Sequence, residues 1–303
     1  MSLTRDMVEG LRIALGESRP LPEPLAAETI EPPPKRVFPN QYQRGAYAAK
    51  AAAHTTALVG IGNVGTRYAT NVVLQFQAEL AVAHAAVAAE LPDGWATENG
   101  LLSLKSRVTD HHEYLLRPDL GRRLDEESLA LLRENATTGI DVQPILADGL
   151  SAVACMGSGM ELLEAFTKEC RQRGWSVGTP MAARYARVWL EDEVGETVGA
   201  RVACILLGER PGLGTGDGLS AYMVYEPRIG KTDGDRNMMS NIHARGTRPA
   251  QAAERLALVA GAMLEQRTSG VDLDLSGIQD RIGDAAGGLR EPQVREQLVE
   301  SGP

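Results

Sequence analysis

Residues 200–208 read ARVACILLG; the glycine-rich run ERPGLGTGDG follows at 209–218, and SAYMVYEP occupies 220–227. The first stretch is almost wholly apolar, which predicts a strand buried on both faces of a sheet. The glycines predict a loop, and the third stretch predicts a further strand. Because such burial requires helices on both faces of the sheet, this part of the chain points to an α/β fold.

The segments around this strand predict the rest of the sheet. DVQPILAD (141–148) and YARVWLED (185–192) are typical of strands, and GMELLEAFTKECRQRG (159–174) is typical of a helix. A last helix is predicted over 248–270, with a proline in its first turn. We therefore expect an α/β fold with a Rossmann-like open sheet flanked by helices over residues 137–273.

A flexible extension is predicted at the N-terminus. Residues 1–18 place apolar and charged side chains on opposite faces of an amphipathic helix. Residues 19–53 form a linker, since seven prolines lie between positions 20 and 39. The helix is interpreted as a docking or targeting peptide, and the alternative is a helix folded back on the body of the protein.

Between the linker and the sheet, residues 54–136 predict a helical N-terminal subdomain. One long helix is expected over 70–91, and a shorter one is expected after Asp125, whose carboxylate is a suitable N-terminal cap. The C-terminal tail, residues 274–303, is polar and contains several glycines, so we expect it to pack weakly.

Composition excludes several classes of protein. The chain has 303 residues, a formal net charge of −9 and 43% hydrophobic residues, which indicates a globular protein and disfavours nucleic-acid binding. No run approaches the roughly 20 apolar residues that a membrane-spanning helix needs. Asp6 and Glu9 interrupt any signal peptide. Three scattered cysteines, Cys155, Cys170 and Cys204, are typical of core residues in a cytoplasmic protein.

Gly60, Gly62 and Gly65 have the G-x-G-x-x-G spacing of a dinucleotide-binding loop. That loop requires a strand before the glycines and a second strand ending in an acidic residue about 20 positions later. Here the acid at that separation, Glu79, falls inside the predicted helix 70–91. We favour a turn into that helix, and a dinucleotide-binding oxidoreductase that uses Gly60–Gly65 is kept as the alternative function.

Three polar segments are better candidates for a binding site. Glu209 and Arg210 come directly after the buried strand, ADGLSA (147–152) ends another strand, and DRNMMSNIHARG (235–246) is interpreted as a third polar loop. Ligands of open α/β sheets bind beyond the carboxyl ends of the strands. These loops indicate a site for a large polar ligand or a partner subunit; the alternative for Glu209 and Arg210 is a tight turn with a surface ion pair.

Other motifs carry less weight. TDHHEYL (109–115) contains adjacent histidines and acids, but no second cluster completes a ligand set, so a solvated surface run is favoured over a metal site. His243 stands alone, and no hydrolase or P-loop motif is present. We predict no catalytic and no metal-binding residues in this chain. An enzyme of this size without its own catalytic residues is either one subunit of a larger enzyme or depends on a cofactor.

Taken together, these segments resemble the small (light) subunit of ethanolamine ammonia-lyase. The resemblance runs in order from about residue 57 to 273 and is strongest from Gly208 to Arg228 and in SNIH (240–243). The runs that carry it are FQAELAVAHAAV, YLLRPDLGRRL, LADGLSA, VGTPMAARYARVWLEDEVGE, LLGERPGLGTGDGLSAYMVYEPR, DRNMMSNIHARGT and AAERLALVAGAMLEQRTSGVDL.

The resemblance implies a function. Enzymes of this family use adenosylcobalamin to convert ethanolamine to acetaldehyde and ammonia by a radical mechanism. The substrate site lies in a large TIM-barrel subunit, and the small subunit covers the cobalamin between the two chains in a complex with six copies of each. The N-terminal helix resembles the extension that directs this subunit into bacterial microcompartments.

The resemblance also implies which residues contact the cofactor. The matching positions are Val188 in ARVWLED, Glu209 in GERPG and Met238 in the segment before SNI, where the family usually has cysteine. Cobalamin proteins that replace the lower base use D-x-H-x-x-G; here Asp110 and His112 are present but Leu115 occupies the glycine position, so that motif is rejected.

Overall fold

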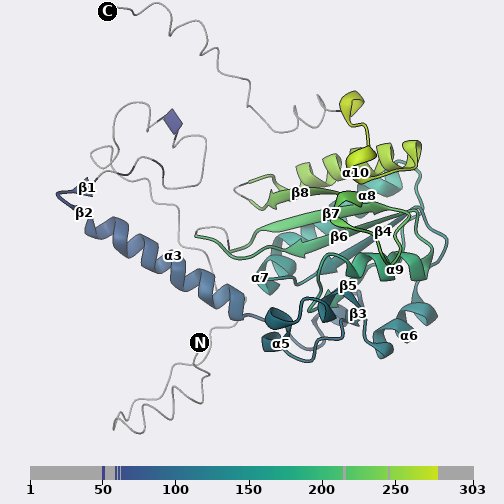
Figure 1. Cartoon of the computed structure of the whole chain (residues 1–303), viewed down its shortest axis with the longest axis horizontal. Coiled ribbons are helices and arrows are strands. Elements are labelled where there is room, and N and C mark those ends of the chain that lie inside the picture. Colours follow the sequence, from purple (N-terminus) through teal and green to yellow (C-terminus); the bar gives the residue numbers. More distant parts are fainter. Residues whose placement is uncertain are drawn as a thin grey trace, which may run out of the picture.

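The computed structural model describes residues 50–51, 59, 61, 63–213, 216–244 and 246–278. Its centre is a six-stranded sheet in the order β3-β5-β4-β6-β7-β8 (Figure 1). The strands are β3 (Leu102–Lys105), β4 (Val142–Ala147), β5 (Met181–Arg184), β6 (Val202–Gly208), β7 (Leu219–Tyr225) and β8 (Arg236–Ile242). Neighbours from β3 to β6 are parallel, and β6, β7 and β8 are antiparallel. The predicted α/β class is confirmed, with a mixed sheet.

Helices cover both faces of the sheet. On one face α8 (Met160–Gln172) packs against α10 (Pro249–Gln266), and on the other α9 (Leu190–Val198) packs on β6 and on α6 (Glu126–Asn135). Each face of the sheet has its own hydrophobic core. Successive strand residues point to opposite faces, so Leu206 belongs to one core and Ile205 to the other. Burying each such aliphatic side chain contributes about 1.5–3 kcal/mol to the stability of the fold. The prediction of a strand buried on both faces is confirmed in β6.

The prediction of a strand at 185–192 is wrong. Tyr185 follows β5 with φ +55°, which turns the chain out of the sheet, and α9 then begins at Leu190. Leu190, Val194 and Val198 recur with helical spacing and are buried, while acids fill the first turn of α9, where the helix dipole favours them.

The segment 235–246 is also different from its prediction, because residues 236–242 form the edge strand β8 instead of a polar loop. Only Arg236 and Ile242 of this strand are buried. An edge strand that faces solvent along most of its length carries polar side chains, and its composition therefore resembles that of a loop.

Two predictions about the fold are not confirmed. In the Rossmann fold the first strand lies in the middle of the sheet, whereas β3, the first strand of this sheet, lies at its edge. The range predicted as a helical N-terminal subdomain contributes β3 to the same sheet, and α6 packs on β3. The two helices expected in that range are confirmed as α3 (Thr70–Ala88) and α6, where the Asp125 carboxylate accepts the Ser128 N–H at 2.7 Å.

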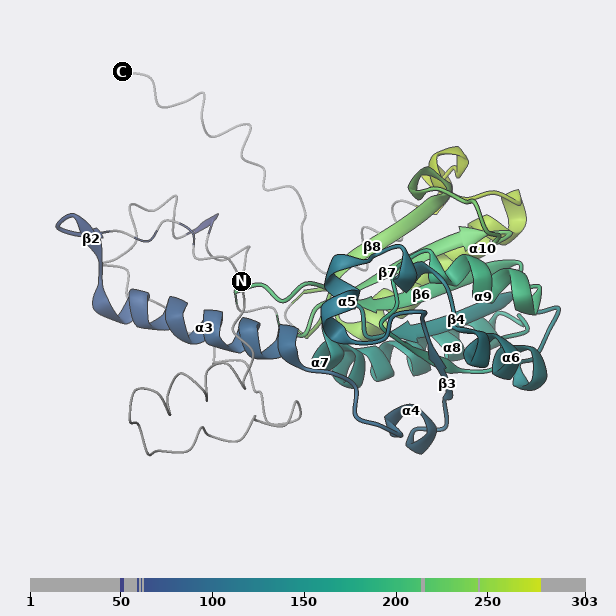
Figure 2. The same ribbon diagram turned by 60° about the horizontal axis from the view of Figure 1, so that its bottom comes forward.

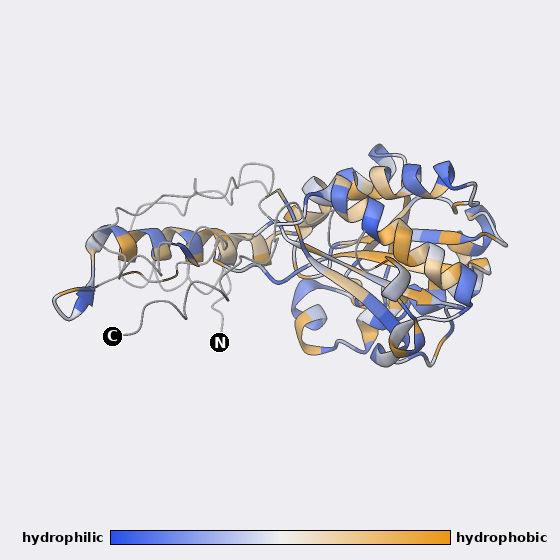
Figure 3. Cartoon of the chain, turned by 90° about the horizontal axis from the view of Figure 1, so that it is seen from above, coloured by the Kyte–Doolittle hydropathy of each residue, from blue (hydrophilic) through white to orange (hydrophobic). Residues whose placement is uncertain are grey.

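The remaining helices are α4 (Trp95–Glu98), α5 (His111–Leu116) and the short α7 (Ala152–Ala154). The helix α3 extends away from the sheet and contacts the body at α7 (Figures 1 and 2). Apolar residues lie along α3 outside the body (Figure 3). No helix among the described residues is long and apolar enough to cross a membrane.

Gly65, the last glycine of the fingerprint, does not lie at a strand–helix junction. Gly65, with φ +64°, forms the turn of a small hairpin between β1 (Asn63–Val64) and β2 (Arg67–Tyr68), ahead of α3. Gly60 and Gly62 lie outside the described residues, as do the predicted N-terminal helix, most of the linker and the tail from residue 279. All three cysteines are free and buried, as predicted for core residues.

Candidate functional site

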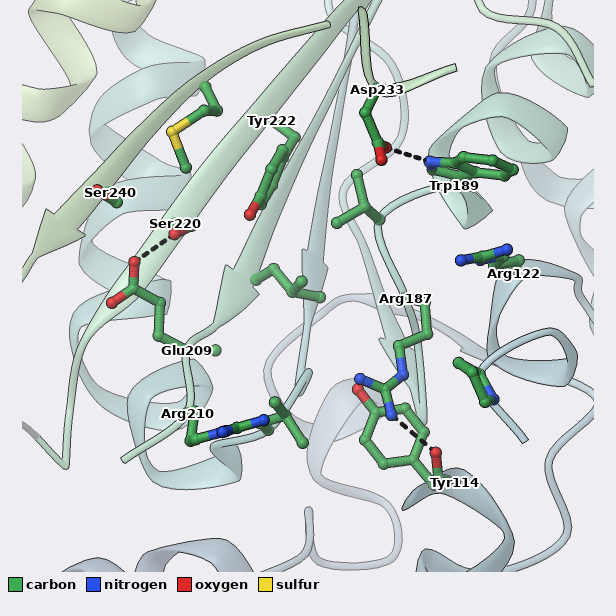
Figure 4. Close-up of a pocket in the computed structure, with 16 residues that line it drawn as sticks. Tyr114, Arg122, Arg187, Trp189, Glu209, Arg210, Ser220, Tyr222, Asp233 and Ser240 are labelled. Carbon is green, nitrogen blue, oxygen red and sulfur yellow. Dashed lines mark hydrogen bonds between the residues drawn. The ribbon is translucent and has the colours of Figure 1, made fainter. Parts of the chain in front are cut away.

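A pocket of about 620 Å³ opens at the carboxyl ends of β4, β5 and β6, over the face of β7 and β8 (Figure 4). Val188, Glu209 and Met238, the three residues singled out from the sequence, all line it. They come from the turn after β5, the end of β6 and the middle of β8. Leu150, from the predicted loop 147–152, lines it as well.

The walls combine apolar and polar side chains. Met238 is 55% exposed and lies opposite Tyr222 in the β7–β8 register, so both side chains share the pocket face. Val188 and Leu207 are half-buried and pack on the core beneath. The arrangement offers an apolar floor with charged groups around it, which is typical of sites for large organic ligands.

Glu209 is oriented by its neighbours. Its Oε1 accepts hydrogen bonds from the Ser220 hydroxyl and, at 3.3 Å, from the Asn241 N–H. Its own backbone N–H donates to the Gly218 carbonyl at 2.9 Å. A carboxylate has about four lone-pair positions, so this side chain has capacity to accept further donors from a ligand. Figure 4 shows Glu209 and Arg210 at the same side of the pocket.

The turn that carries Val188 is held by a buried acid. The carboxylate of Asp148 accepts the Tyr185 N–H at 2.8 Å and the Ala186 N–H at 3.2 Å. Burial raises the pKa of Asp148 to about 7, against the lowering effect of those backbone N–H groups. This acid lies directly after β4 and was not singled out from the sequence, although ADGLSA contains it.

Arg187 and Tyr114 form one wall together. The guanidinium lies 4.0 Å from the centre of the Tyr114 ring and donates to the Tyr114 carbonyl at 2.8 Å (Figure 4). The Tyr114 hydroxyl donates to the Ala186 carbonyl at 2.9 Å, and burial raises the pKa of that hydroxyl. Sequence reasoning missed both residues; adjacency to Val188 was the one signal for Arg187.

Trp189 lines the pocket on the same side as Arg187, across from Glu209 (Figure 4). Its indole N–H donates to Asp233 at 2.6 Å, and the Arg122 guanidinium lies 4.2 Å from its ring centre. A cation stacked on an aromatic face in this way contributes about 0.5–1 kcal/mol when exposed. These residues were also missed, because they come from three segments that only the fold brings together.

A buried ion cluster joins α9 to β8 close to the pocket. The Arg236 guanidinium contacts Glu191 at 2.9 Å and Asp192 at 2.6 Å, and all three side chains are buried. Burial raises the pKa of Glu191 to about 8 and also raises that of Asp192. The cluster fixes the strand that bears Met238 relative to the helix that follows Val188.

The segment 109–115 serves to begin a helix. Asp110 accepts the Glu113 N–H at 2.9 Å as the cap of α5, and Glu113 accepts the Thr109 N–H at 2.8 Å. His243 is buried outside the pocket, and its ring bonds to Asn241 at 2.7 Å. Within the described part of the chain, no group of three His, Cys, Asp or Glu side chains is arranged to hold a metal ion.

The pocket has no cysteine or histidine among its lining residues to act as nucleophile or base. The family model for the ethanolamine ammonia-lyase light chain matches residues 46–274. The chain belongs to the ethanolamine ammonia-lyase light chain family. The family predicted from the sequence runs is thereby confirmed.

A curated relative within this family is the ethanolamine ammonia-lyase small subunit of Fusobacterium nucleatum subsp. nucleatum. It is 42% identical over 221 residues, which cover 73% of this chain and 75% of the relative. The matched range 46–274 includes β1 to α10 and therefore every residue of the pocket. With Gly65 in a hairpin turn, the dinucleotide-binding alternative has no support from the described residues.

Proposed function

We propose that this chain is the small subunit of an adenosylcobalamin-dependent ethanolamine ammonia-lyase, which converts ethanolamine to acetaldehyde and ammonia by a radical mechanism. In this proposal the pocket covers one side of the cobalamin at the interface with the large catalytic subunit. The observation that carries the proposal is the meeting of Val188, Glu209 and Met238 in a single open pocket.

The residues of the pocket fit a corrin. The face of such a macrocycle is apolar, which suits Leu150, Val188 and Met238, and its rim carries amides whose N–H groups can donate to Glu209. Burial of the exposed Met238 side chain against a ligand is favourable by about 25 cal/mol per Å². The methionine in place of the family's usual cysteine supplies more apolar surface and no thiol.

The chain's own contribution is binding and orientation. Bound adenosylcobalamin supplies the radical that abstracts hydrogen from the substrate, and the substrate site belongs to the large subunit. Here the ordered turn at Val188, the fixed carboxylate of Glu209 and the strand of Met238 hold the ligand in one place. Covering it also excludes water, which protects a reactive centre from side reactions.

The large subunit is the proposed partner, in a hetero-oligomer with six copies of each chain. The surface of helix α3 supports an extended interface, since Leu74 is 58% exposed and Leu80 is 47% exposed. The helix contains two titratable residues, Glu79 and His84. A helix that is apolar on most sides is normally buried. Because Gly216, from the segment after β6, lies beside the C-terminal turns of α3, the same partner can cover both the pocket and this helix.

The proposed location is the cytoplasm, inside a bacterial microcompartment. The support is the resemblance of residues 1–18 to the targeting extension of this subunit, and that segment lies outside the described residues. Deleting residues 1–18 should leave the activity of the complex unchanged and release it from purified shells.

Reconstitution tests the main proposal. The chain alone should be inactive, and its complex with the large subunit should form acetaldehyde from ethanolamine when adenosylcobalamin is added. Val188→Asp and Glu209→Ala should each raise the dissociation constant for cyanocobalamin about 10-fold or more, whereas Glu134→Ala, on the exposed face of α6, should not. Unchanged binding in both pocket variants would overturn the proposal.

A further inference from the structure

We propose that Asp148 is a positioning residue of this pocket: its buried carboxylate holds the turn after β5 and thereby sets the place of Val188. The inference rests on the proposed function, since the pocket is taken to bind cobalamin. Asp148 does not line the pocket itself, and its side chain faces the backbone of residues 185 and 186.

The carboxylate continues the sheet where backbone pairing stops. The parallel ladder between β4 and β5 ends at Ala147 and Ala183. Beyond it, the N–H groups of Tyr185 and Ala186 are buried, and each is accepted by one oxygen of Asp148, at 2.8 Å and 3.2 Å. A backbone N–H that is buried without a partner is costly. Since the backbone of β4 provides no further acceptor here, the Asp148 carboxylate takes its place.

The turn needs this support because of its backbone conformation. Tyr185 has φ +55°, a left-handed conformation that a bulky residue adopts only when the surroundings impose it. Two carbonyls of the turn are also bound, since the Ser106 hydroxyl donates to Tyr185 at 2.8 Å and the Tyr114 hydroxyl donates to Ala186 at 2.9 Å. Asp148 accepts the N–H groups of the same two residues.

The same acid connects two walls of the pocket. It precedes Gly149 and Leu150, and the Leu150 N–H donates to the Gly208 carbonyl at 2.9 Å, directly before Glu209. On its other side it holds the segment that leads to Val188. A displacement of either loop therefore changes the distance between Val188 and Glu209.

An isosteric substitution separates this role from folding. In Asp148→Asn one oxygen remains to accept a hydrogen bond, while the new NH₂ group meets a backbone N–H, so two donors face each other. Altering groups that orient the ligands of a metal site typically costs about 10- to 100-fold in affinity, and we expect a loss of similar size here. The matched control is Asp141→Asn at the other end of the sheet, where Asp141 accepts the Ser176 N–H at 2.9 Å and pairs with Arg201.

The experiment uses the complex of full-length small and large subunits. At about pH 8.5, where the Asp148 carboxylate is ionised, cyanocobalamin binding is followed by visible absorbance, and the KM for adenosylcobalamin and the kcat are measured with saturating ethanolamine. Asp148→Asn should raise the dissociation constant and the KM about 10- to 100-fold with kcat within about 3-fold. Asp141→Asn should leave all three unchanged.

Equal cofactor binding by the wild type and Asp148→Asn overturns the inference and leaves the proposed function intact. Failure of the wild-type complex to bind cyanocobalamin overturns the proposed function instead. If Asp148→Asn does not assemble, Ser106→Ala weakens the same turn from its other side, and it should raise the dissociation constant less but in the same direction. No change in that variant also counts against the inference.

Discussion

Gly149 and Gly208 face each other where the loop after β4 meets the end of β6. A Cβ atom built on Gly149 would lie 2.3 Å from the Gly208 carbonyl oxygen, and one built on Gly208 would lie 2.3 Å from the Asp148 carbonyl oxygen. Gly149 also has φ +53°, which disfavours other residues. The two glycines thus allow two walls of the pocket to approach closely.

Gly208→Ala should destabilise the chain by about 1–3 kcal/mol, because its methyl group meets fixed backbone atoms and forces them apart. Urea unfolding of the full-length protein measures the change. Gly157→Ala is the control, since nothing lies within 4 Å of a Cβ at that position. Equal stability of the two variants would show that the close approach is not required.

Arg236→Met should cost about 3–5 kcal/mol of folding free energy, because Glu191 and Asp192 then remain buried without their guanidinium partner. Arg228→Met removes an exposed arginine and should change stability little. Thermal unfolding of both variants at neutral pH distinguishes them. Coinciding melting curves would contradict a structural role for the cluster.

Stability should depend on pH through Asp148. Its pKa is raised from 3.8 to about 7 in the folded state, so the folded chain binds this proton at higher pH than the unfolded chain does. As the pH falls from about 8 to about 4, the wild type should therefore gain up to about 4 kcal/mol relative to Asp148→Asn, at about 1.4 kcal/mol per pKa unit. Urea titrations at several pH values measure this difference, and a constant difference would be the contrary result.

Charges on α3 should weaken assembly. Leu74→Asp and Leu80→Asp place a carboxylate on exposed apolar positions, so the isolated chain should stay folded while its affinity for the large subunit falls at least about 10-fold. The control Asn135→Asp adds the same charge at an exposed position of α6 and should leave the affinity unchanged. Analytical ultracentrifugation of mixtures reports the affinity, and wild-type affinity in both leucine variants would exclude α3 from the interface.

The elements that were predicted correctly carry strong local patterns. β6 is a continuous apolar run, α8 and α10 have helical periodicity, and the cap at Asp125 begins α6. The elements that were missed have weak local sequence patterns. β3 and β5 are four residues long, too short to show a period, and 185–192 has the apolar content of a strand although Tyr185 turns the chain into α9.

The sequence by itself determined the α/β class, the buried strand β6 and the family, and it singled out three candidate residues, because these depend on local patterns and on motifs read in order along the chain. Only the tertiary structure decided that Val188, Glu209 and Met238 share one pocket with Tyr114, Arg187 and Trp189. It also decided that the Asp148 carboxylate accepts the N–H groups of Tyr185 and Ala186. The reason is physical: parallel strands are joined through helices, so residues far apart in the chain meet at one edge of the sheet, and their contacts leave no local pattern.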